Sequence, residues 1–384
     1  MNTTAASHTT VWLDKICKAN SAEELRNFMQ QQYPALTAEK LKSIAILGAA
    51  DEGQRLYQLC QNLNIQVVAM VDDHPARQGL KFGNLSVKPV ATLSDVSRDI
   101  PVIAATHRFL KSIQIVKQLG FSTVAPFATL QALQPERFPE HMFYERWFET
   151  LFNHKKELTR LANMLADDLS KQTLEAILSF RLTLNPEVLE PIIDWNVYAP
   201  KNIFAFKDNE IYVDGGTFDG DTIRMFIDRV HGKFDYIYGF EPDTNTFGKL
   251  CENFADDSRI KPINKGLYSH DTTLYFDNAG TRASIFNPDA AEGISLPVTS
   301  LDKVMNGNRV TYIKMNIEGA EIPALNGAKE TIQKWSPKLG ISIYHRPQDL
   351  WEIPFLIREL NPAYKLYLRQ QDLGVIEGVI YAVV

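Results

Sequence analysis

A glycine-rich run that also carries acids, VDGGTFDGDT at residues 213–222, is the strongest signal for chemistry in the sequence. Asp214 ends a predicted strand, and Gly215 and Gly216 open a tight turn. Gly220 lets the next predicted helix approach closely. Glycine permits positive φ angles and close backbone contact with a ligand, and the helix that follows offers free N–H groups at its N-terminus. The run therefore predicts a ligand-binding loop at a strand end.

The acids of this loop narrow the choice of ligand. The run lacks the G-x-G-x-x-G spacing of a nicotinamide-binding turn, and the carboxylates of Asp214 and Asp219 are unfavourable beside a pyrophosphate. They suit a ligand with a cationic amino group and a sulfonium, which is S-adenosylmethionine. Glu241 ends the next predicted strand, where an acid can accept hydrogen bonds from both ribose hydroxyls. The alternatives are a plain strand–helix turn for the loop and a solvated acid for Glu241.

A second run, YIKMNIEGAE at residues 312–321, reads as a strand that leads into a polar loop. Asn316 stands at the strand tip, and its amide can hydrogen-bond but cannot take up a proton as a carboxylate does. Glu318 on the same loop and His345 at the end of the predicted strand ISIYH are the candidate bases. Structural roles stay open for both, and Arg346 is either a surface ion-pair partner or a ligand for an anionic substrate group.

A third loop lies near the N-terminus. The run AILGAADEG predicts a strand, a glycine turn with Gly48 and Gly53, and a helix, and the following strand ends at Asp72 and Asp73. These residues predict a nucleotide or nucleotide-sugar site at Gly48, Gly53 and Asp72. The alternative is a structural or docking domain with an empty pocket.

The elements that must hold these loops fall into blocks of an α/β chain. Short apolar strands alternate with helices in two regions, which indicates parallel sheets covered by helices, and an amphipathic helical region separates them. The sequence thus predicts two Rossmann-like domains joined by a helical segment. The predicted blocks are an N-terminal tail and helical segment at 1–42, a small Rossmann-like domain at 43–127, a helical subdomain at 128–200 and the second α/β domain at 201–384.

Composition excludes several classes of protein. The chain has 384 residues, 45% of them hydrophobic, and a net charge of −6 without a Lys/Arg block, which argues against a nucleic-acid surface. Cys17, Cys60 and Cys251 are far apart, so we expect no disulfide framework and no metal site. The polar start, MNTTAASHTT, does not read as a signal peptide, and no apolar run approaches the roughly 20 residues of a membrane span. These features favour a cytoplasmic protein.

The motifs of the last half resemble the FkbM-type family of S-adenosylmethionine-dependent methyltransferases. The resemblance covers roughly residues 200–384 and includes YVDGGTFDGDT, GFEPD, VTSLDKV, YIKMNIEGAEIPALNGAKETI and PKLGISIYHRPQDLWEIPFLIREL in the family's order. It implies a class I methyltransferase fold, which is a seven-stranded sheet with an antiparallel last strand. It also implies methyl transfer, usually to a hydroxyl oxygen of a sugar or a natural-product scaffold, and we expect a sugar or glycoconjugate as the acceptor. The cofactor-binding residues expected from loop and resemblance are Asp214, Gly215, Gly216, Thr217, Phe218, Gly220, Thr222, Glu241 and Asn316.

One position departs from the family's pattern. The family reads D-I-E-G-A-E where this chain reads N-I-E-G-A-E, so Asn316 replaces the usual Asp beside the methyl donor. The expected catalytic residues are therefore Asn316 for orientation and Glu318 or His345 for proton transfer. A non-catalytic protein that binds the cofactor or a nucleotide-sugar is the alternative function, and a nicotinamide oxidoreductase is a third. Residues 43–127 are similar to the N-terminal domain of bacterial sugar-modifying acyltransferases, which implies a nucleotide-sugar partner.

Overall fold

The computed structural model describes residues 10–106, 109–276, 294–371 and 377–384. The chain divides into two compact units. The first comprises Met1–Thr159, Gln172–Ile193 and Asp372–Ile376, and the second comprises Arg160–Lys171, Asp194–Gln371 and Glu377–Val384.

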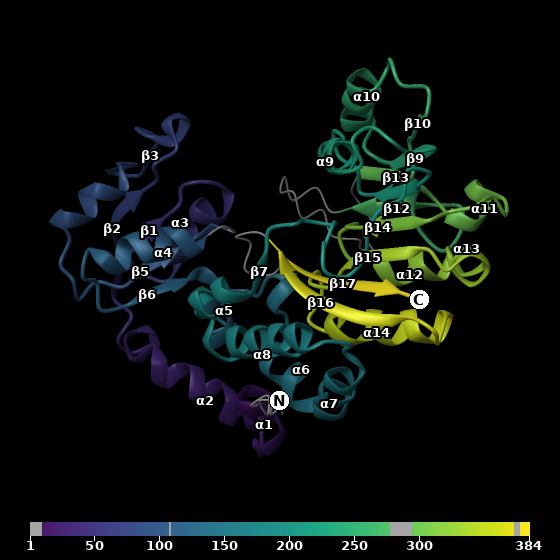
Figure 1. The fold of residues 1–384 in the computed structure, drawn as a ribbon. Helices are drawn as coiled ribbons and strands as arrows, with labels where there is room; N and C mark the ends of the chain where they lie inside the picture. Colours follow the sequence, from purple (N-terminus) through teal and green to yellow (C-terminus); the bar gives the residue numbers. More distant parts are fainter. Residues whose placement is uncertain (1–9, 107–108, 277–293, 372–376) are drawn as a thin grey trace, which may run out of the picture. The chain divides into compact units, whose positions relative to one another are not determined.

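The first unit contains a four-stranded parallel sheet of order β2-β1-β5-β6 (Figure 1). Its strands are short apolar runs whose side chains are mostly buried, as expected when helices cover both faces of a parallel sheet. The strands are β1 (Ser43–Leu47), β2 (Gln66–Val71), β5 (Val102–Ala104) and β6 (Val124–Pro126), with a small hairpin of β3 (Lys81–Phe82) and β4 (Leu85–Ser86). The helices before and between them are α1 (Val11–Lys18), α2 (Ala22–Gln32), α3 (Asp51–Asn62) and α4 (Phe109–Gln118).

The region between the two sheets is helical, as the sequence predicts, but it is broken into separate helices. These are α5 (Phe127–Leu133), α6 (Trp147–Asn153), α7 (Lys155–Met164) and α8 (Asp168–Thr183). The break after α7 falls where the N–H of Ala166 bonds to the carbonyl of Leu366, a strand-like contact. Leu158, Leu161 and Leu165 are buried along the predicted apolar stripe, whereas Leu169, beyond the break, is exposed.

The second unit is built on an eight-stranded sheet of order β10-β9-β8-β14-β15-β17-β16-β7. The neighbours from β10 to β15 pair in parallel, and β17 lies antiparallel between β15 and β16 (Figure 1). The predicted sheet had seven strands, one fewer than the sheet observed. The additional strand is β7 at the edge, which has two residues and is too short to give a periodic pattern in the sequence. The strands are β7 (Ile193–Asp194), β8 (Ile211–Gly215), β9 (Tyr236–Phe240), β10 (Ile260–Ile263), β14 (Tyr312–Met315), β15 (Lys338–Ser342), β16 (Lys365–Gln371) and β17 (Gly378–Val383).

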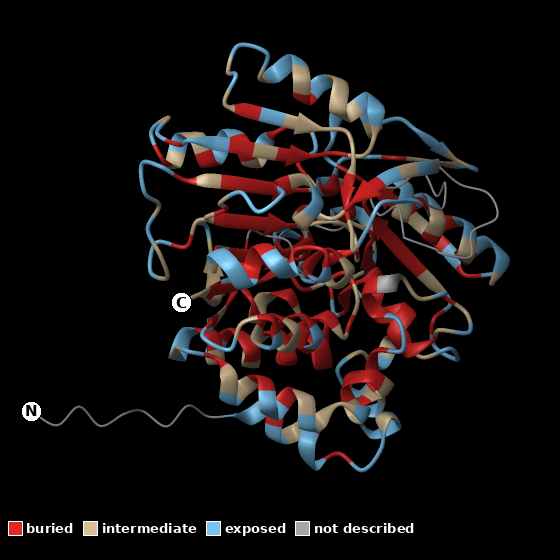
Figure 2. Cartoon of the chain, turned by 90° about the vertical axis from the view of Figure 1, so that its right-hand side faces the viewer, coloured by how far each residue is buried: buried red, intermediate tan, exposed pale blue. Residues whose placement is uncertain are grey.

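Helices cover this sheet, and each helix buries the face that it turns toward the sheet. Figure 2 shows buried strands between helices whose outer faces are exposed. On one face of the sheet, Tyr212 stacks against both Phe226 and Tyr312 with ring centroids 4.5 and 5.1 Å apart. The helices are α9 (Asp221–Arg229), α10 (Thr244–Asn253), α11 (Leu301–Met305), α12 (Glu321–Asn326), α13 (Lys329–Trp335) and α14 (Asp349–Leu360).

A separate three-stranded sheet, β11-β13-β12, joins the second unit and was not predicted. Its strands are β11 (Gly266–Leu267), β12 (Thr272–Phe276) and β13 (Ile294–Thr299).

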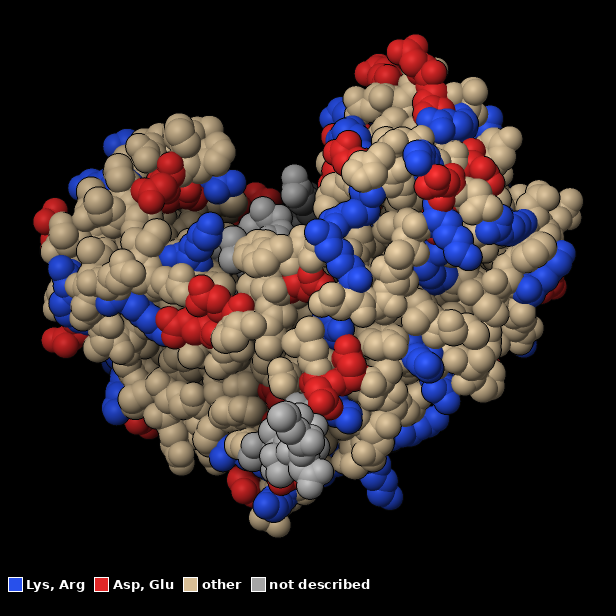
Figure 3. Space-filling view, in the orientation of Figure 1, with Lys and Arg blue, Asp and Glu red and all other residues tan. Residues whose placement is uncertain are grey.

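Two surface properties bear on function. Within the described residues, no helix is long and apolar enough to cross a membrane. On the face shown in Figure 3, Lys and Arg are interspersed with Asp and Glu within each unit. A nucleic-acid surface instead gathers Lys and Arg on one face.

Candidate functional site

The loop after β8 has the conformation that its glycines predict. Gly216 and Gly220 have φ angles of 74° and 91°, a region that side chains with a Cβ rarely adopt. A Cβ on Gly216 would lie 2.0 Å from the carbonyl oxygen of Asn316, so the loop passes close to the tip of β14. Gly220 begins α9 as its N-cap residue and packs on the ring of Phe254. The glycines thus fix a tight turn beside the neighbouring strand.

Asp214 lies beneath this loop rather than at its surface. Its carboxylate is fully buried, its Oδ1 lies 2.9 Å from Lys314 Nζ, and the hydroxyl of Thr222 donates a hydrogen bond to its Oδ2. Burial raises the pKa of Asp214, while the Lys314 charge opposes that rise. Thr217 is also buried, and its hydroxyl donates to the backbone carbonyl of Asp214. These side chains support the loop from inside.

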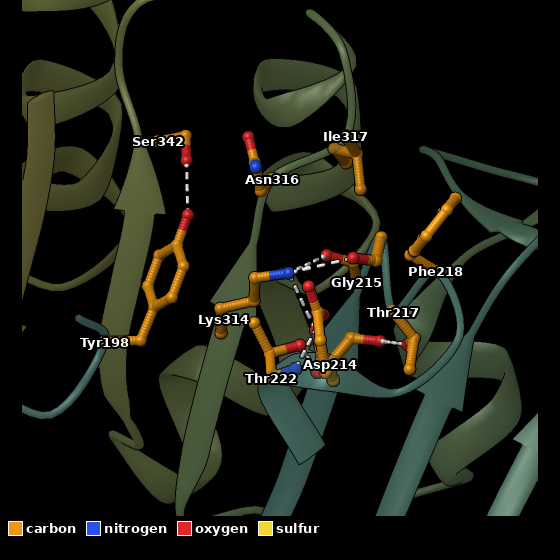
Figure 4. A network of polar contacts seen from close by, with 12 residues as sticks. Tyr198, Asp214, Gly215, Thr217, Phe218, Thr222, Lys314, Asn316, Ile317 and Ser342 are labelled. Atoms are coloured by element: carbon orange, nitrogen blue, oxygen red, sulfur yellow. Dashed lines mark hydrogen bonds and ion pairs between the residues drawn. The ribbon is translucent and has the colours of Figure 1, made fainter. Parts of the chain in front are cut away.

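Lys314 is the residue of this site that the sequence analysis missed. It lies in β14, is completely buried, and donates from Nζ to the carbonyls of Gly215 at 3.1 Å and Gly216 at 2.9 Å (Figure 4). One ammonium group therefore holds both the acid and the first two carbonyls of the loop. The only signal was a single lysine inside an otherwise apolar strand, because a buried lysine needs partners to remain charged.

Glu241 closes the loop from the other side. It follows β9, is almost fully buried, and accepts the N–H of Phe218 at 3.0 Å and that of Asp243 at 2.9 Å. Burial raises the pKa of Glu241 to about 7, although the two backbone N–H groups act against the rise. Phe218, which has a φ of 52°, presents a ring that is 50% exposed. The structure thus brings the glycine loop and the acid after the second strand together.

Asn316 stands at the tip of β14 and is oriented by a neighbouring strand end. The hydroxyl of Tyr344 donates to Asn316 Oδ1 at 2.9 Å, which directs the amide NH₂ away from Tyr344. The backbone N–H of Asn316 bonds to the carbonyl of Gly215 at 3.1 Å. Next to it, the hydroxyls of Tyr198 and Ser342 are 3.0 Å apart (Figure 4). A cluster of hydrogen-bonding groups therefore surrounds the strand tip.

The two candidate bases lie close together but differ in exposure. His345 Nε2 is 3.7 Å from a carboxylate oxygen of Glu318, whose side chain is 38% exposed, whereas His345 is completely buried. On its other side, His345 Nδ1 is 3.0 Å from Glu321 Oε1. Burial opposes the charged form of His345, but nearby carboxylates, first among them Glu321, raise its pKa to about 9. Burial raises the pKa of Glu318, and His345 counteracts that rise.

The guanidinium group of Arg346 forms an ion pair within the protein. Its guanidinium donates to Asp349 Oδ1 from Nε at 3.0 Å and from a terminal nitrogen at 2.7 Å. Its backbone N–H donates to the other oxygen of Asp349 at 2.8 Å. These contacts correspond to the ion-pair alternative of the sequence analysis rather than to an anion-binding group.

In the first unit, the predicted nucleotide-sugar residues have structural roles. Asp72 is buried and accepts N–H groups from Ala49 at 2.9 Å and His74 at 2.8 Å. A Cβ on Gly53 would lie 2.0 Å from the carbonyl oxygen of Gly48, so the first turn of α3 packs directly on the glycine turn. These contacts account for Gly48, Gly53 and Asp72 and provide no support for a nucleotide-sugar there.

Comparison with known proteins gives a family match for residues 214–372, most of which lie in the second unit. Residues 214–372 match the family model of the methyltransferase FkbM domain. No curated protein matches the sequence. The matched segment begins at Asp214 and includes the glycine loop, Glu241, the β14 tip and His345.

Comparison with solved structures gives further similarities. The chain is similar to the methyltransferase FkbM from Methylobacillus flagellatus KT, with 24% identity over 97% of this chain and 99% of that one, and a TM-score of 0.76. An rRNA methylase from Streptococcus thermophilus is 14% identical, with 53% of this chain and 95% of that one covered and a TM-score of 0.31. Fibrillarin from Aeropyrum pernix is 12% identical, with 52% and 74% covered and a TM-score of 0.32. The first match shows the same fold along nearly the whole chain.

The fold and the family match together define the class, an α/β protein of the methyltransferase type. Residues 214–372 form a methyltransferase FkbM domain, as the motifs of this region predicted.

Proposed function

We propose that the protein transfers a methyl group from S-adenosylmethionine to a hydroxyl oxygen of a sugar or glycoconjugate. The observation that carries this proposal is the junction of the glycine loop, Glu241 and the β14 tip at one edge of the sheet. Ligands of open α/β sheets bind at the carboxyl ends of the strands.

The residues at this edge fit the cofactor. Each carboxylate oxygen of Glu241 accepts one backbone N–H and retains a further lone pair, which suits the two hydroxyl donors of a ribose. Beside Glu241, the exposed ring of Phe218 provides an apolar surface. Gly216 has no side chain, so a ligand can approach its backbone closely. Bound S-adenosylmethionine would supply the electrophilic methyl group. Asp214 contributes by fixing the loop through Lys314 and Thr222.

Glu318 is the group best placed to accept the proton of the acceptor hydroxyl. It lies on the same loop as Asn316 and is partly exposed, whereas the fully buried His345 can act only through the carboxylates that it contacts. Burial raises the pKa of Glu318, which makes this carboxylate a better proton acceptor. Asn316, held by Tyr344, would orient the acceptor through its NH₂ group, since alignment is a large part of an in-line displacement.

A non-catalytic binding protein is the second candidate. It is favoured by one observation, which is that the amide of Asn316 stands where the resembled family has a carboxylate. Such a protein would bind S-adenosylmethionine at the loop but would not turn it over.

Two measurements test the proposal. Calorimetry should show that S-adenosylmethionine binds the wild-type chain and that Glu241→Ala weakens this binding strongly. Transfer of labelled methyl groups to a panel of methyl glycosides and nucleotide-sugars should then be lost in Glu318→Gln while cofactor binding is retained. Binding without transfer to any acceptor would favour the non-catalytic alternative, and cofactor binding unchanged in Glu241→Ala would overturn the assigned site.

A further inference from the structure

Three buried side chains from separate elements meet behind the β14 tip. Glu321 is the first residue of α12, His345 follows β15, and Asp349 is the first residue of α14. Each offers one potential ligand atom, and these atoms lie within 4.8 Å of one another. All three side chains are essentially inaccessible to solvent. His345 and Asp349 are close in the sequence, but Glu321 lies on a separate segment, so its position beside them could not be predicted from spacing.

One carboxylate oxygen in this cluster has an unmet requirement. Glu321 Oε1 accepts the N–H of Ile317 at 2.8 Å and lies 3.0 Å from His345 Nδ1. Glu321 Oε2 is buried and has no hydrogen-bond partner among the residues that the structure describes. A buried, unpaired carboxylate oxygen is costly, because it loses its hydration without replacement. Although His345 pairs with the other oxygen of Glu321, Oε2 is thus left as a buried acceptor that a bound cation could use.

The charges around the cluster also favour a bound cation. Three carboxylates face it, those of Glu321 and Asp349 from inside and that of Glu318 from the partly exposed side. Arg346 is paired with Asp349 and supplies one fixed positive charge. A metal ion that binds the imidazole of His345 would displace its proton, and the three carboxylates with Arg346 would then leave a net charge of −2, which a divalent cation would neutralise.

We propose that Glu321, His345 and Asp349 form a binding site for a divalent metal ion, with Glu318 at its open side. One imidazole nitrogen with carboxylate oxygens suits Mn²⁺ or Zn²⁺ better than the all-oxygen preference of Mg²⁺. The contact between Arg346 and Asp349 serves as the outer support that metal-binding carboxylates usually have. The ion would join the loop of Glu318 to the start of α14, and its binding does not depend on methyl transfer.

The test is a calorimetric titration of the EDTA-treated full chain with Mn²⁺ and, separately, with Zn²⁺. One ion should bind per chain, and Glu321→Gln should weaken binding by about 10-fold or more. Glu352→Gln is the matched control, because Glu352 also lies close to Arg346 but is exposed and outside the cluster. It should bind the ion as the wild type does.

Absence of binding of either ion at millimolar concentration would overturn the proposal, as would unchanged affinity in both Glu321→Gln and Asp349→Asn. Electron paramagnetic resonance of Mn²⁺ with the wild-type chain gives a readout that needs no variant, in case Glu321→Gln fails to fold. Binding of S-adenosylmethionine is titrated on the same samples, so failure of the metal site and failure of the proposed function remain distinguishable.

Discussion

The ammonium group of Lys314 lies 2.9 Å from a carboxylate oxygen of Asp214, and both side chains are completely buried. The same ammonium group donates to the carbonyls of Gly215 and Gly216. The first turn of the glycine loop is thus attached to the adjacent strand through a single buried charge pair. Stability and cofactor binding should therefore both respond to changes in this pair.

Lys314→Met should destabilise the protein by about 3–5 kcal/mol, because it leaves the carboxylate of Asp214 buried without its partner. The free energy of unfolding is measured by urea denaturation. The double variant Lys314→Met/Asp214→Asn is the control, and it should be more stable than the sum of the two single effects predicts. Strictly additive effects would show that the two side chains are not coupled.

Affinity for S-adenosylmethionine should rise with pH between about 6 and 8, because the pKa of Glu241 is raised to about 7 and only the ionised carboxylate accepts two hydroxyl donors. Below this pKa the group binds a proton and loses that capacity, so the affinity falls as the pH falls. Calorimetry at several pH values measures the trend. In Glu241→Gln the dependence should disappear, and a flat wild-type profile would contradict the role given to Glu241.

Gly216→Ala should impair cofactor binding and stability together, since its Cβ would lie 2.0 Å from the carbonyl oxygen of Asn316. Gly232→Ala is a matched control with a similar φ of 73° and no atom within 4 Å of the added Cβ. The control should lose about 1–2 kcal/mol from the left-handed backbone alone. Gly216→Ala should lose more, as measured by thermal unfolding. Equal losses would mean that the loop does not press on the β14 tip.

Asn316→Asp should restore methyl transfer in a Glu318→Gln background, because it returns a proton acceptor to the strand tip within reach of the same acceptor oxygen. Tyr344 can still donate to the new carboxylate, so the side chain should keep its orientation. Initial rates of methyl transfer measure the effect. If the double variant stays inactive while it binds S-adenosylmethionine, the tip residue does not face the acceptor.

Local patterns predicted the parts of this site that lie on one stretch of chain. Glycines with an acid at a strand end indicated the loop at residues 214–220, and the strand rhythm placed Glu241 and Asn316 at neighbouring strand tips, since parallel strands end at one edge. Asp214 was predicted to bind the cofactor, but in the structure its carboxylate contacts Lys314 and Thr222 beneath the loop. This acid is buried, and its position at a strand end could not predict whether it faces a ligand or the interior.

The remaining parts depend on contacts between distant segments. In the sequence, Lys314 is a single charged residue in an apolar strand. Its partners become evident only from the pairing of β8 with β14. Glu321 comes from a different segment from His345 and Asp349, so its place beside them is a property of packing. The glycines near the N-terminus followed the same local rule as Gly216, and a Cβ on Gly48 would lie 2.6 Å from the carbonyl oxygen of Ala105, which follows β5. The glycine pattern predicted the turn, but it could not predict which distant residues would pack against it.

The position of β17 has a consequence for how the second unit is made. Residues 378–383 pair with β15 on one side and with β16 on the other, so the segment numbered last lies inside the sheet. While the chain emerges from a ribosome, β15 and β16 would both have an unpaired edge until this segment is released. The sheet can therefore be completed only after residue 383 has been synthesised. A chain cut before β17 would expose the unpaired edges of β15 and β16, which can pair with other chains and cause aggregation.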